Sequence, residues 1–387
     1  MRWIATDNIY TATWRELFEY TNNELTIKNL IKRHGEPKSA RDEANYSKQA
    51  SQARVCVLQA KEYMDAAQAS SVFTSPNHIY YSIYSLASLI MLIMSDGTKS
   101  LDYLRKDSKN RKHGLSFATA CTLNNASTDI NLLKLSSANI LEYGHFPNWY
   151  KSLPRRQPVY ADFENKKGPF STRGIKACGG NSLAPIASIS EKRWSLLDLL
   201  ALFPDLDSDL RKCGVKKIRS LSDMMILENE DQKSITYRWL INGCEDMRDL
   251  DTLLEKFRVE PRFANMMSFT PFPSGLGGEV RMFFMYGDQV RFEWPDVRET
   301  MEHFSISYAD VVEIFEIVEL YLVAYQLSML SRYFPDLWVR CIESQCLSAK
   351  LIARATEVIG RKFPILCLSI LNDEKTVIST YRQPWME

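Results

Sequence analysis

Residues 76–94 read PNHIYYSIYSLASLIMLIM, and after a basic connector the chain continues as RKHGLSF at 111–117. The first stretch is apolar on nearly every side, which predicts a helix that needs neighbours on several sides. Pro76 suits a first helical turn, and Ser75 before it is a good N-cap. The apolar run is shorter than the ~20 residues that cross a bilayer, so it favours a buried core helix over a membrane span.

Three further segments carry the apolar spacing of amphipathic helices and would pack around 76–94. They are residues 48–69, 307–334 and 345–361. A further helix is expected to begin near His113, and 362–371 reads either as a short strand or as a buried helix. The fold class expected is therefore mainly α, in an α+β arrangement.

The β part is expected as a small antiparallel sheet around 232–294, where aromatic and β-branched residues alternate with turn signals. The stretch 151–190 is rich in Pro, Gly and basic residues and predicts a long loop. These observations divide the chain into four parts. They are an N-terminal helical part at 1–150, the basic loop at 151–190, a mixed α/β insertion at 191–300 and C-terminal helices at 301–387.

The overall composition is that of an ordinary globular protein. Of 387 residues, 45% are hydrophobic and 25% charged, and the net charge is +1, so no global field demands a nucleic acid or a membrane. The eight cysteines form no CxxC pair, which argues against structural zinc and suggests a reducing cytoplasm. The N-terminal residues lack the apolar run of a signal sequence. We expect a cytoplasmic protein with no cofactor and no metal.

His113 is the first candidate site residue. A histidine can transfer a proton near pH 7, and Arg111 or Arg105 could stabilise the charge that develops on a phosphorus centre. The alternative, which the sequence favours, is a structural histidine that caps a helix and hydrogen-bonds a neighbour.

Basic side chains give two further candidate sites. The cluster 105–112 and the basic loop could bind the phosphates of a nucleic acid, with nearby aromatic rings as stacking partners. A solvated basic surface is the alternative. The candidate nucleic-acid-binding residues of the loop are Arg155, Arg156, Lys166, Lys167 and Arg173.

Arg332 follows a long apolar segment. It is expected to pair with Asp336 or with a glutamate, or else to line a cleft.

Several ordered motifs resemble the YaaC-like family of bacterial proteins. They are QAKEYMDAA, SPNHIYYSIYSLASLIMLI, HGLSF, WSLLDLLALFPDL, YLVAYQLSMLSRYFPDLWV and KFPILCLSIL. The tyrosine-rich helix followed by HGL is also similar to HEPN helical domains, which implies a HEPN-like bundle as the core. In HEPN nucleases, arginine and histidine in an R-x4–6-H motif from two protomers form one RNA-cleaving site. Here seven residues separate Arg105 from His113, and one separates Arg111 from it.

The function expected is a non-catalytic interaction or assembly component of a bacterial multi-protein system, with anti-phage defence as one such system. One alternative is a metal-independent endoribonuclease or toxin that uses His113 with Arg105 or Arg111. Another is a sensor of nucleic acids or nucleotides. The partners expected are other protein subunits, with a homodimer through the bundle and RNA or DNA as further options, and no membrane.

Overall fold

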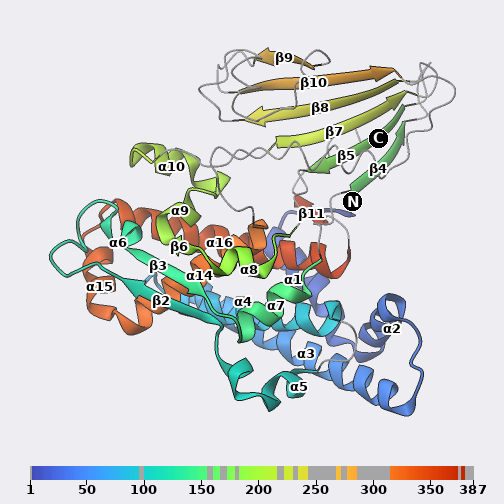
Figure 1. Ribbon diagram of the computed structural model, residues 1–387, viewed down its shortest axis with the longest axis horizontal. Coiled ribbons are helices and arrows are strands. Elements are labelled where there is room, and N and C mark those ends of the chain that lie inside the picture. The colour runs from blue at the N-terminus through green and yellow to red at the C-terminus, as the bar shows by residue number, and fades with distance from the viewer. Residues whose placement is uncertain are drawn as a thin grey trace.

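Helix α4 (Ser75–Met94) lies at the centre of the helical body in the computed structural model (Figure 1). It contacts α3 (Ala40–Ala69), α14 (Glu316–Tyr333), α16 (Leu347–Leu371) and α7 (His145–Ser152). Within the described part of the chain, α4 alone is long and apolar enough to cross a membrane, and 72% of its most apolar window is buried by these neighbours. The prediction of a core helix is confirmed.

The structure describes residues 2–95, 100–154, 160–165, 172–178, 183–215, 222–229, 234–242, 267–271, 277–285, 314–373 and 376–379. The expected helix at 307–334 is thus confirmed as α14 over its described part, while 307–313 lie outside these ranges.

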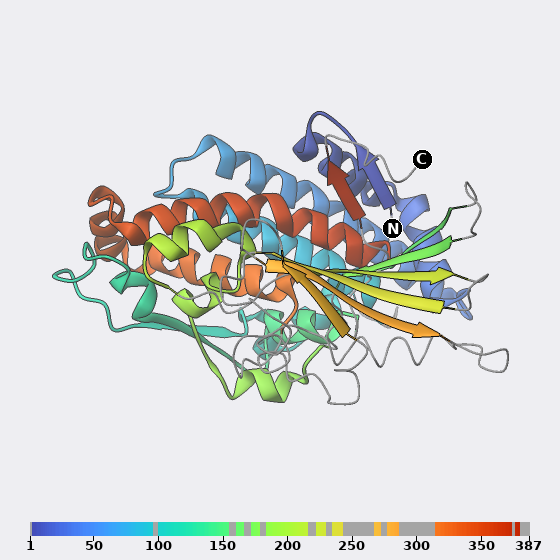
Figure 2. The same cartoon turned by 90° about the horizontal axis from the view of Figure 1, so that it is seen from above.

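Two helices are longer than the sequence pattern indicates. Helix α3 begins at Ala40, where the Ser39 side chain accepts a hydrogen bond from the Asp42 N–H. Helix α16 continues through Pro364 to Leu371, so 362–371 is the last part of a buried helix and not a strand. Figure 2 shows α16, in red, running along the length of the helical body. Helices from the first and last parts of the chain therefore form one packed group.

A three-stranded antiparallel sheet covers one side of this group. Its order is β2 (Leu115–Thr119), β3 (Ser136–Ile140) and β6 (Arg193–Ser195). The expectation of a helix beginning near His113 is therefore wrong, because a strand begins two residues after it. The short helix α9 (Leu196–Leu200) follows directly after β6.

A second, six-stranded antiparallel sheet lies above the helical body in Figure 1. The inserted sheet is confirmed, and it is larger than expected because β4, β5 and β7 precede 232–294. Strands β4 and β5 also fall within 151–190, so the prediction of a loop there is wrong for these residues. The strands in spatial order are β4 (Tyr160–Asn165), β5 (Thr172–Cys178), β7 (Ser222–Asn229), β8 (Ser234–Asn242), β10 (Gly277–Met285) and β9 (Met267–Pro271).

The two ends of the described chain meet. Strand β1 (Arg2–Ala5) pairs in parallel with β11 (Thr376–Ser379), and Figure 2 shows the two strands side by side. The remaining short elements surround the helical group. They are α1 (Ile9–Leu17), η1 (Phe18–Thr21), α2 (Asn23–His34), α5 (Leu101–Lys106), η2 (Ser108–Arg111), α6 (Asn131–Lys134), α8 (Ile186–Ser190), η3 (Pro204–Leu206), α10 (Asp207–Lys212) and α15 (Pro335–Glu343).

Candidate functional site

A contact between two glycine backbones positions two histidines against α4. Gly114 has φ +79° and Gly144 has φ +122°, conformations that favour glycine. A Cβ on Gly144 would lie 2.5 Å from the Gly114 Cα, so a side chain at this position does not fit. The Phe146 N–H donates to the His113 carbonyl at 2.9 Å and ties the two segments together. His113 precedes the first glycine and His145 follows the second, so both imidazoles reach the same cluster of aromatic rings.

His145 forms the inner end of this cluster. Its Nε2 lies 2.9 Å from the Ser88 Oγ, and its Nδ1 lies 3.0 Å from the Tyr321 hydroxyl. Because the Ser88 hydroxyl donates to the Tyr84 carbonyl, it accepts from His145, and the network assigns the Nε2–H tautomer. Burial, and secondarily the neighbouring His113, lower the pKa of His145 to about 3. The imidazole is therefore neutral at physiological pH.

The cluster continues outward from Tyr321, whose ring packs edge-on against the Tyr80 ring with 5.9 Å between the centroids. The Tyr321 hydroxyl donates to the His145 Nδ1, because the Nε2–H tautomer leaves Nδ1 as an acceptor. The Tyr80 hydroxyl in turn is hydrogen-bonded to the His113 Nδ1 at 2.8 Å. The His113 Nε2 makes no hydrogen bond to another described residue. Burial and then the charge of Arg332 lower the pKa of His113.

Ring packing encloses the network. The ring of Tyr84 stacks on His145 at 3.6 Å between centroids, and Trp149 stacks on Tyr321 at 4.7 Å. Burial raises the pKa of the Tyr80 and Tyr321 hydroxyls well above the ordinary value. Every group in the network is thus uncharged, which is how polar groups are tolerated in an apolar core.

At the outer end, a half-buried arginine lies among tyrosine rings. Arg332 donates to the Tyr81 hydroxyl at 2.7 Å, and its guanidinium carbon lies 5.4 Å from the Tyr81 ring centroid and 5.0 Å from that of Tyr333. Tyr63 stacks on Tyr81 at 5.4 Å. We refer to Tyr63, Tyr81, Arg332 and Tyr333 as the tyrosine–arginine stack. The tyrosine side of it is open, because Tyr333 is 61% exposed and Tyr63 36%.

The expected ion pair of Arg332 with Asp336 or a glutamate is not formed. In the part of the chain that the structure describes, Arg332 contacts tyrosines and its own helix but no carboxylate. The physical reason is its position in the last turn of α14, where Ser328 and Tyr81 are within reach.

The predicted partners of His113 lie elsewhere. Arg111 donates from Nε to the Arg105 carbonyl at 2.9 Å, and both side chains are exposed. Neither forms a hydrogen bond with His113 among the described residues. The His113 side chain is hydrogen-bonded to a neighbouring helix through Tyr80 of α4, and among the described residues it makes no hydrogen bond that caps a helix. The cation whose charge acts on His113 is Arg332.

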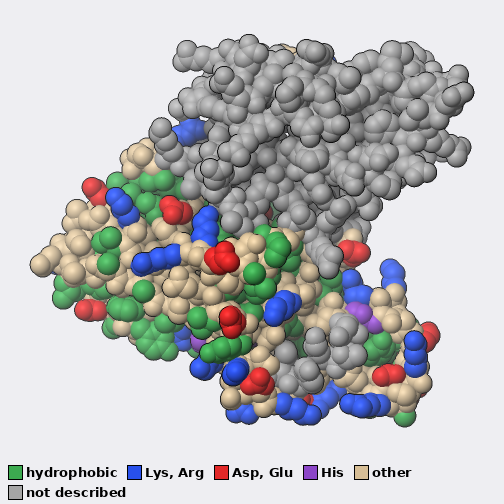
Figure 3. Space-filling view, in the orientation of Figure 1, with side chains coloured by type: hydrophobic (Ala, Val, Ile, Leu, Met, Phe, Trp, Pro, Cys, Tyr) green, Lys and Arg blue, Asp and Glu red, His purple; other side chains and the backbone are tan. Residues whose placement is uncertain are grey.

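The basic cluster at 105–112 lies on the surface. Arg105, Lys106, Lys109, Arg111 and Lys112 are all exposed, and we call them the basic patch. The amines of Lys109 and Lys112 lie 5.4 Å and 5.7 Å from the ring centroid of Tyr143. Figure 3 shows Lys and Arg side chains along the lower edge of the view, where Figure 1 has α5.

Most of the basic loop residues fall outside the described ranges. Arg155, Arg156, Lys166 and Lys167 are among these, and only the backbone of Arg173 is described, as part of β5. Within the described ranges, no group of three or more His, Cys, Asp or Glu side chains could hold a metal ion.

The buried network was missed at the sequence level. Nothing in the local sequence around His145 or Tyr321 shows that the two side chains meet in the fold. One signal was available, since HG at 113–114 and GH at 144–145 are mirror-image dipeptides, and each joins a histidine to a residue that tolerates positive φ.

Fold and site together define a mainly helical protein with inserted antiparallel sheets and an uncharged histidine–tyrosine network at its centre. A family model described as YaaC-like Protein matches residues 19–371, and the chain belongs to this family. No curated protein and no solved structure matches the chain.

Proposed function

We propose that the chain is a non-catalytic interaction component of a bacterial multi-protein system, and that it binds a protein partner through the tyrosine–arginine stack. The observation that carries the proposal is Arg332. A half-buried guanidinium normally has a carboxylate partner, because burying an unpaired charge is costly. Among the described residues Arg332 has tyrosines instead. A partner that supplies the carboxylate would complete the site.

The chemistry of the stack also indicates the kind of partner. Tyrosine and arginine are the residues that most often dominate binding energy at protein interfaces. Exposed apolar side chains lie close by: Phe73 is 36% exposed and Val339 37%, and a hydrogen bond from the Trp338 indole to the Phe73 carbonyl joins their two segments. We infer a protein segment that presents one acidic side chain next to apolar ones.

A nucleic acid fits this surface less well. Binding a phosphate backbone takes several cations, and the stack holds one arginine, with the acidic Asp336 exposed shortly after it. The related expectations belong to the proposal as well. They are a HEPN-like bundle formed by α3, α4, α14 and α16, a cytoplasmic location, other subunits of one system as partners, and a role in anti-phage defence.

The test is site-specific photo-crosslinking in the cell. A benzoylphenylalanine at position 333 is expected to give one discrete crosslinked protein, with the crosslink next to an Asp or Glu. Arg332→Glu should abolish the crosslink, and Arg41→Glu, at an exposed arginine in the first turn of α3, should leave it intact. The proposal is overturned if position 333 gives no discrete product, if the product is a nucleic acid, or if Arg332→Glu has no effect.

The second candidate function is nucleic-acid binding at the basic patch. The observation that favours it is the exposed Tyr143 ring beside Lys109 and Lys112, since an aromatic face with adjacent cations suits an unpaired base and its phosphate. Lys109→Glu together with Lys112→Glu should weaken binding of single-stranded RNA at least tenfold and flatten its salt dependence. Equal affinity and salt dependence in the double variant would exclude this surface.

A further inference from the structure

We propose that the helical body binds a small, uncharged and mainly apolar molecule in a pocket between α1, α3, α4 and α16. The pocket is separate from the tyrosine–arginine stack, and the proposal does not depend on the function proposed above. It rests on three features of the pocket: its volume, its lining and the state of its polar groups.

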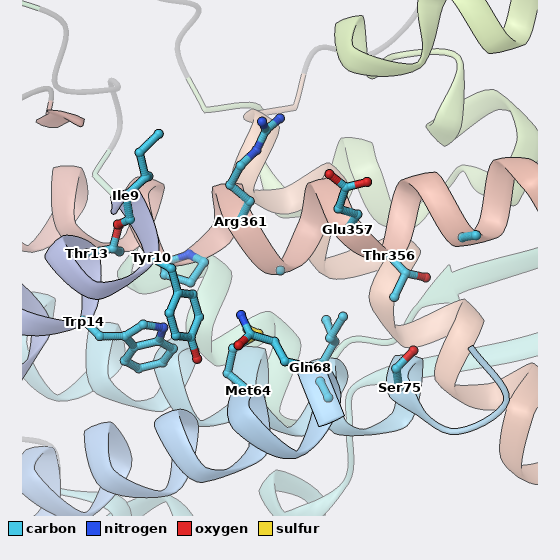
Figure 4. A pocket seen from close by; sticks show the side chains of 15 residues that line it. Ile9, Tyr10, Thr13, Trp14, Met64, Gln68, Ser75, Thr356, Glu357 and Arg361 are labelled. Atoms are coloured by element: carbon cyan, nitrogen blue, oxygen red, sulfur yellow. The ribbon is translucent and has the colours of Figure 1, made fainter. Parts of the chain in front are cut away.

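The pocket has a volume of about 400 Å³, within the range of sites for small ligands. The pocket opens to the surface between the helices, with buried side chains such as Trp14, Met64 and Ile79 on its inner wall. Figure 4 shows Tyr10 and Trp14 of α1 on one side, Met64 and Gln68 of α3 below, and Glu357 and Arg361 of α16 above. The remaining lining residues are Ile9, Thr13, Ala67, Ser75, Ile79, Ala353, Thr356, Gly360 and Pro364.

Small residues keep the space open. Ala67, Ala353 and Gly360 line it where the facing helices would otherwise fill it with larger side chains. A Cβ added to Gly360 would lie 3.5 Å from the Met64 sulfur and 3.6 Å from the Ile79 Cδ1, which are ordinary contacts. An alanine would therefore fit at Gly360, so steric crowding of the neighbours does not explain the glycine. A ligand that occupies the volume does.

One wall of the pocket carries a backbone acceptor. Pro364 lies inside α16 and has no N–H, so the usual helical hydrogen bond to the carbonyl of Gly360 cannot form. Both residues line the pocket. On the facing helix, the Gln68 side-chain amide makes no hydrogen bond to another described residue, and Figure 4 shows it between α3 and α16. A ligand could thus donate a hydrogen bond to the Gly360 carbonyl of α16 and form another with the Gln68 side-chain amide of α3.

The charged groups at the rim are already neutralised. Arg361 lies 2.8 Å from a carboxylate oxygen of Asp205, and Glu357 lies 2.6 Å from Arg354. Tyr10 donates its hydroxyl to an Asp65 carboxylate oxygen at 2.6 Å. The hydroxyls of Thr13 and Thr356 donate to carbonyls of their own helices. Among the described residues that line the pocket, no charge is left unpaired to balance a charged ligand, so we infer a neutral ligand with one or two hydrogen-bonding groups.

Titration with N-phenyl-1-naphthylamine, a neutral apolar fluorophore, tests the pocket in the full-length protein. The wild-type chain should show a saturable rise in fluorescence. Ala353→Trp places an indole at the mouth of the pocket and should weaken binding at least tenfold. Ala44→Trp is the matched control, because Ala44 is exposed near the N-terminal end of α3 and does not line the pocket. This variant should bind the fluorophore as the wild type does. Native mass spectrometry of protein purified from its host should show a bound neutral species that Ala353→Trp lacks.

The results of this titration distinguish specific binding in the pocket from nonspecific binding of the fluorophore elsewhere on the protein. Unsaturable fluorescence in the wild type, or equal affinity in Ala353→Trp, overturns the proposal. Ala353→Trp is replaced as the test variant if its thermal melting curve shows that it does not fold. Gly360→Leu then serves instead, because Gly360 also lines the pocket and a leucine there would occupy part of its volume. Loss of crosslinking at position 333 with unchanged fluorophore binding would overturn the proposed function and leave the pocket standing.

Discussion

The aromatic cluster around α4 has two ends made of the same residue types in different surroundings. At the inner end, His145 and Tyr321 are fully buried and each has hydrogen-bond partners inside the protein. At the outer end, His113 and Arg332 are half-buried, and Tyr333 is largely exposed. Both ring nitrogens of the inner histidine are hydrogen-bonded, whereas the Nε2 of the outer one has no partner among the described residues.

This difference teaches that residue type alone does not assign a role to a histidine. Burial makes the inner end a structural network, because each polar atom there would be costly to leave unpaired. Partial exposure leaves unused hydrogen-bonding capacity at the outer end, and a partner can use it. Mutations and pH should therefore separate the two ends, and the expected effects below run from the largest to the smallest.

The glycine contact supports both ends, so its loss should have the largest effect. Gly144→Ala should destabilise the fold by roughly 3–5 kcal/mol, because it combines a positive φ with a backbone clash. Gly35→Ala is the control, since Gly35 has φ +91° but open space around it, and should cost only about 1–2 kcal/mol. Urea denaturation measures both, and equal losses would show that the contact is not constraining.

Removing each imidazole should distinguish the inner end from the outer end. His145→Ala breaks two buried hydrogen bonds and leaves a cavity, so it should cost about 3 kcal/mol. His113→Ala breaks one hydrogen bond at a half-buried position and should cost about 1 kcal/mol. Equal free energies of unfolding in the two variants would contradict the comparison.

The inner histidine should also make stability depend on pH. The pKa of His145 is about 3 in the folded chain and about 6.5 when unfolded, so between these values only the unfolded chain binds the proton. Stability should therefore be full above pH 6.5 and fall on acidification towards pH 3, by up to about 1.4 kcal/mol per pH unit from this group. His145→Asn should reduce that slope in denaturation curves recorded at several pH values. An unchanged slope would mean that other groups cause it.

Tyr333, the most exposed residue of the cluster, should contribute least to the free energy of unfolding. Tyr333→Ala should change stability by less than about 0.5 kcal/mol, because the side chain is exposed, while it removes partner binding. A combination of thermal melting and the crosslinking assay, with the crosslinker moved to position 63, checks both statements. A large loss of stability would place Tyr333 with the structural end.

Catalysis should be absent at His113. If the protein is a binding component, the purified wild type and His113→Ala should leave single-stranded RNA equally intact over hours. Cleavage by the wild type that is lost in His113→Ala would instead favour the endoribonuclease alternative. Arg332→Ala should then be compared with Arg105→Ala, since the charge of Arg332 is the one that acts on the histidine.

The sequence predicts the helical core because the evidence for it is local and periodic. All-round apolarity at 76–94 requires neighbours, and the spacing in 48–69 and 345–361 supplies them. The strand after His113 could not be predicted, because it depends on pairing with β3 about twenty residues further on, which no local pattern reveals. The hairpin β4–β5 was missed because the density of Pro, Gly and charge outweighed short β-forming stretches such as YADFEN.

The candidate sites also contain residues that the sequence identifies and partners that it does not. His113 and Arg332 were identified because a histidine beside glycine and an arginine after an apolar helix stand out in a sequence. Their partners could not be predicted, since Tyr80 lies 33 residues from His113 in the sequence and Tyr81 lies 251 residues from Arg332. The pocket could not be predicted either, because it depends on which small residues of α3 and α16 face each other in space.

The central position of α4 has a consequence for synthesis on the ribosome. Its neighbours α14 and α16 are translated only after residues 95–315. Until then, the apolar side chains of α4 that pack against these two helices have no partners. During that interval the growing chain exposes surface that invites aggregation or membrane insertion. Chains truncated before residue 316 should therefore be held by chaperones or degraded, and the C-terminal helices act as the step that commits the nascent protein to its fold.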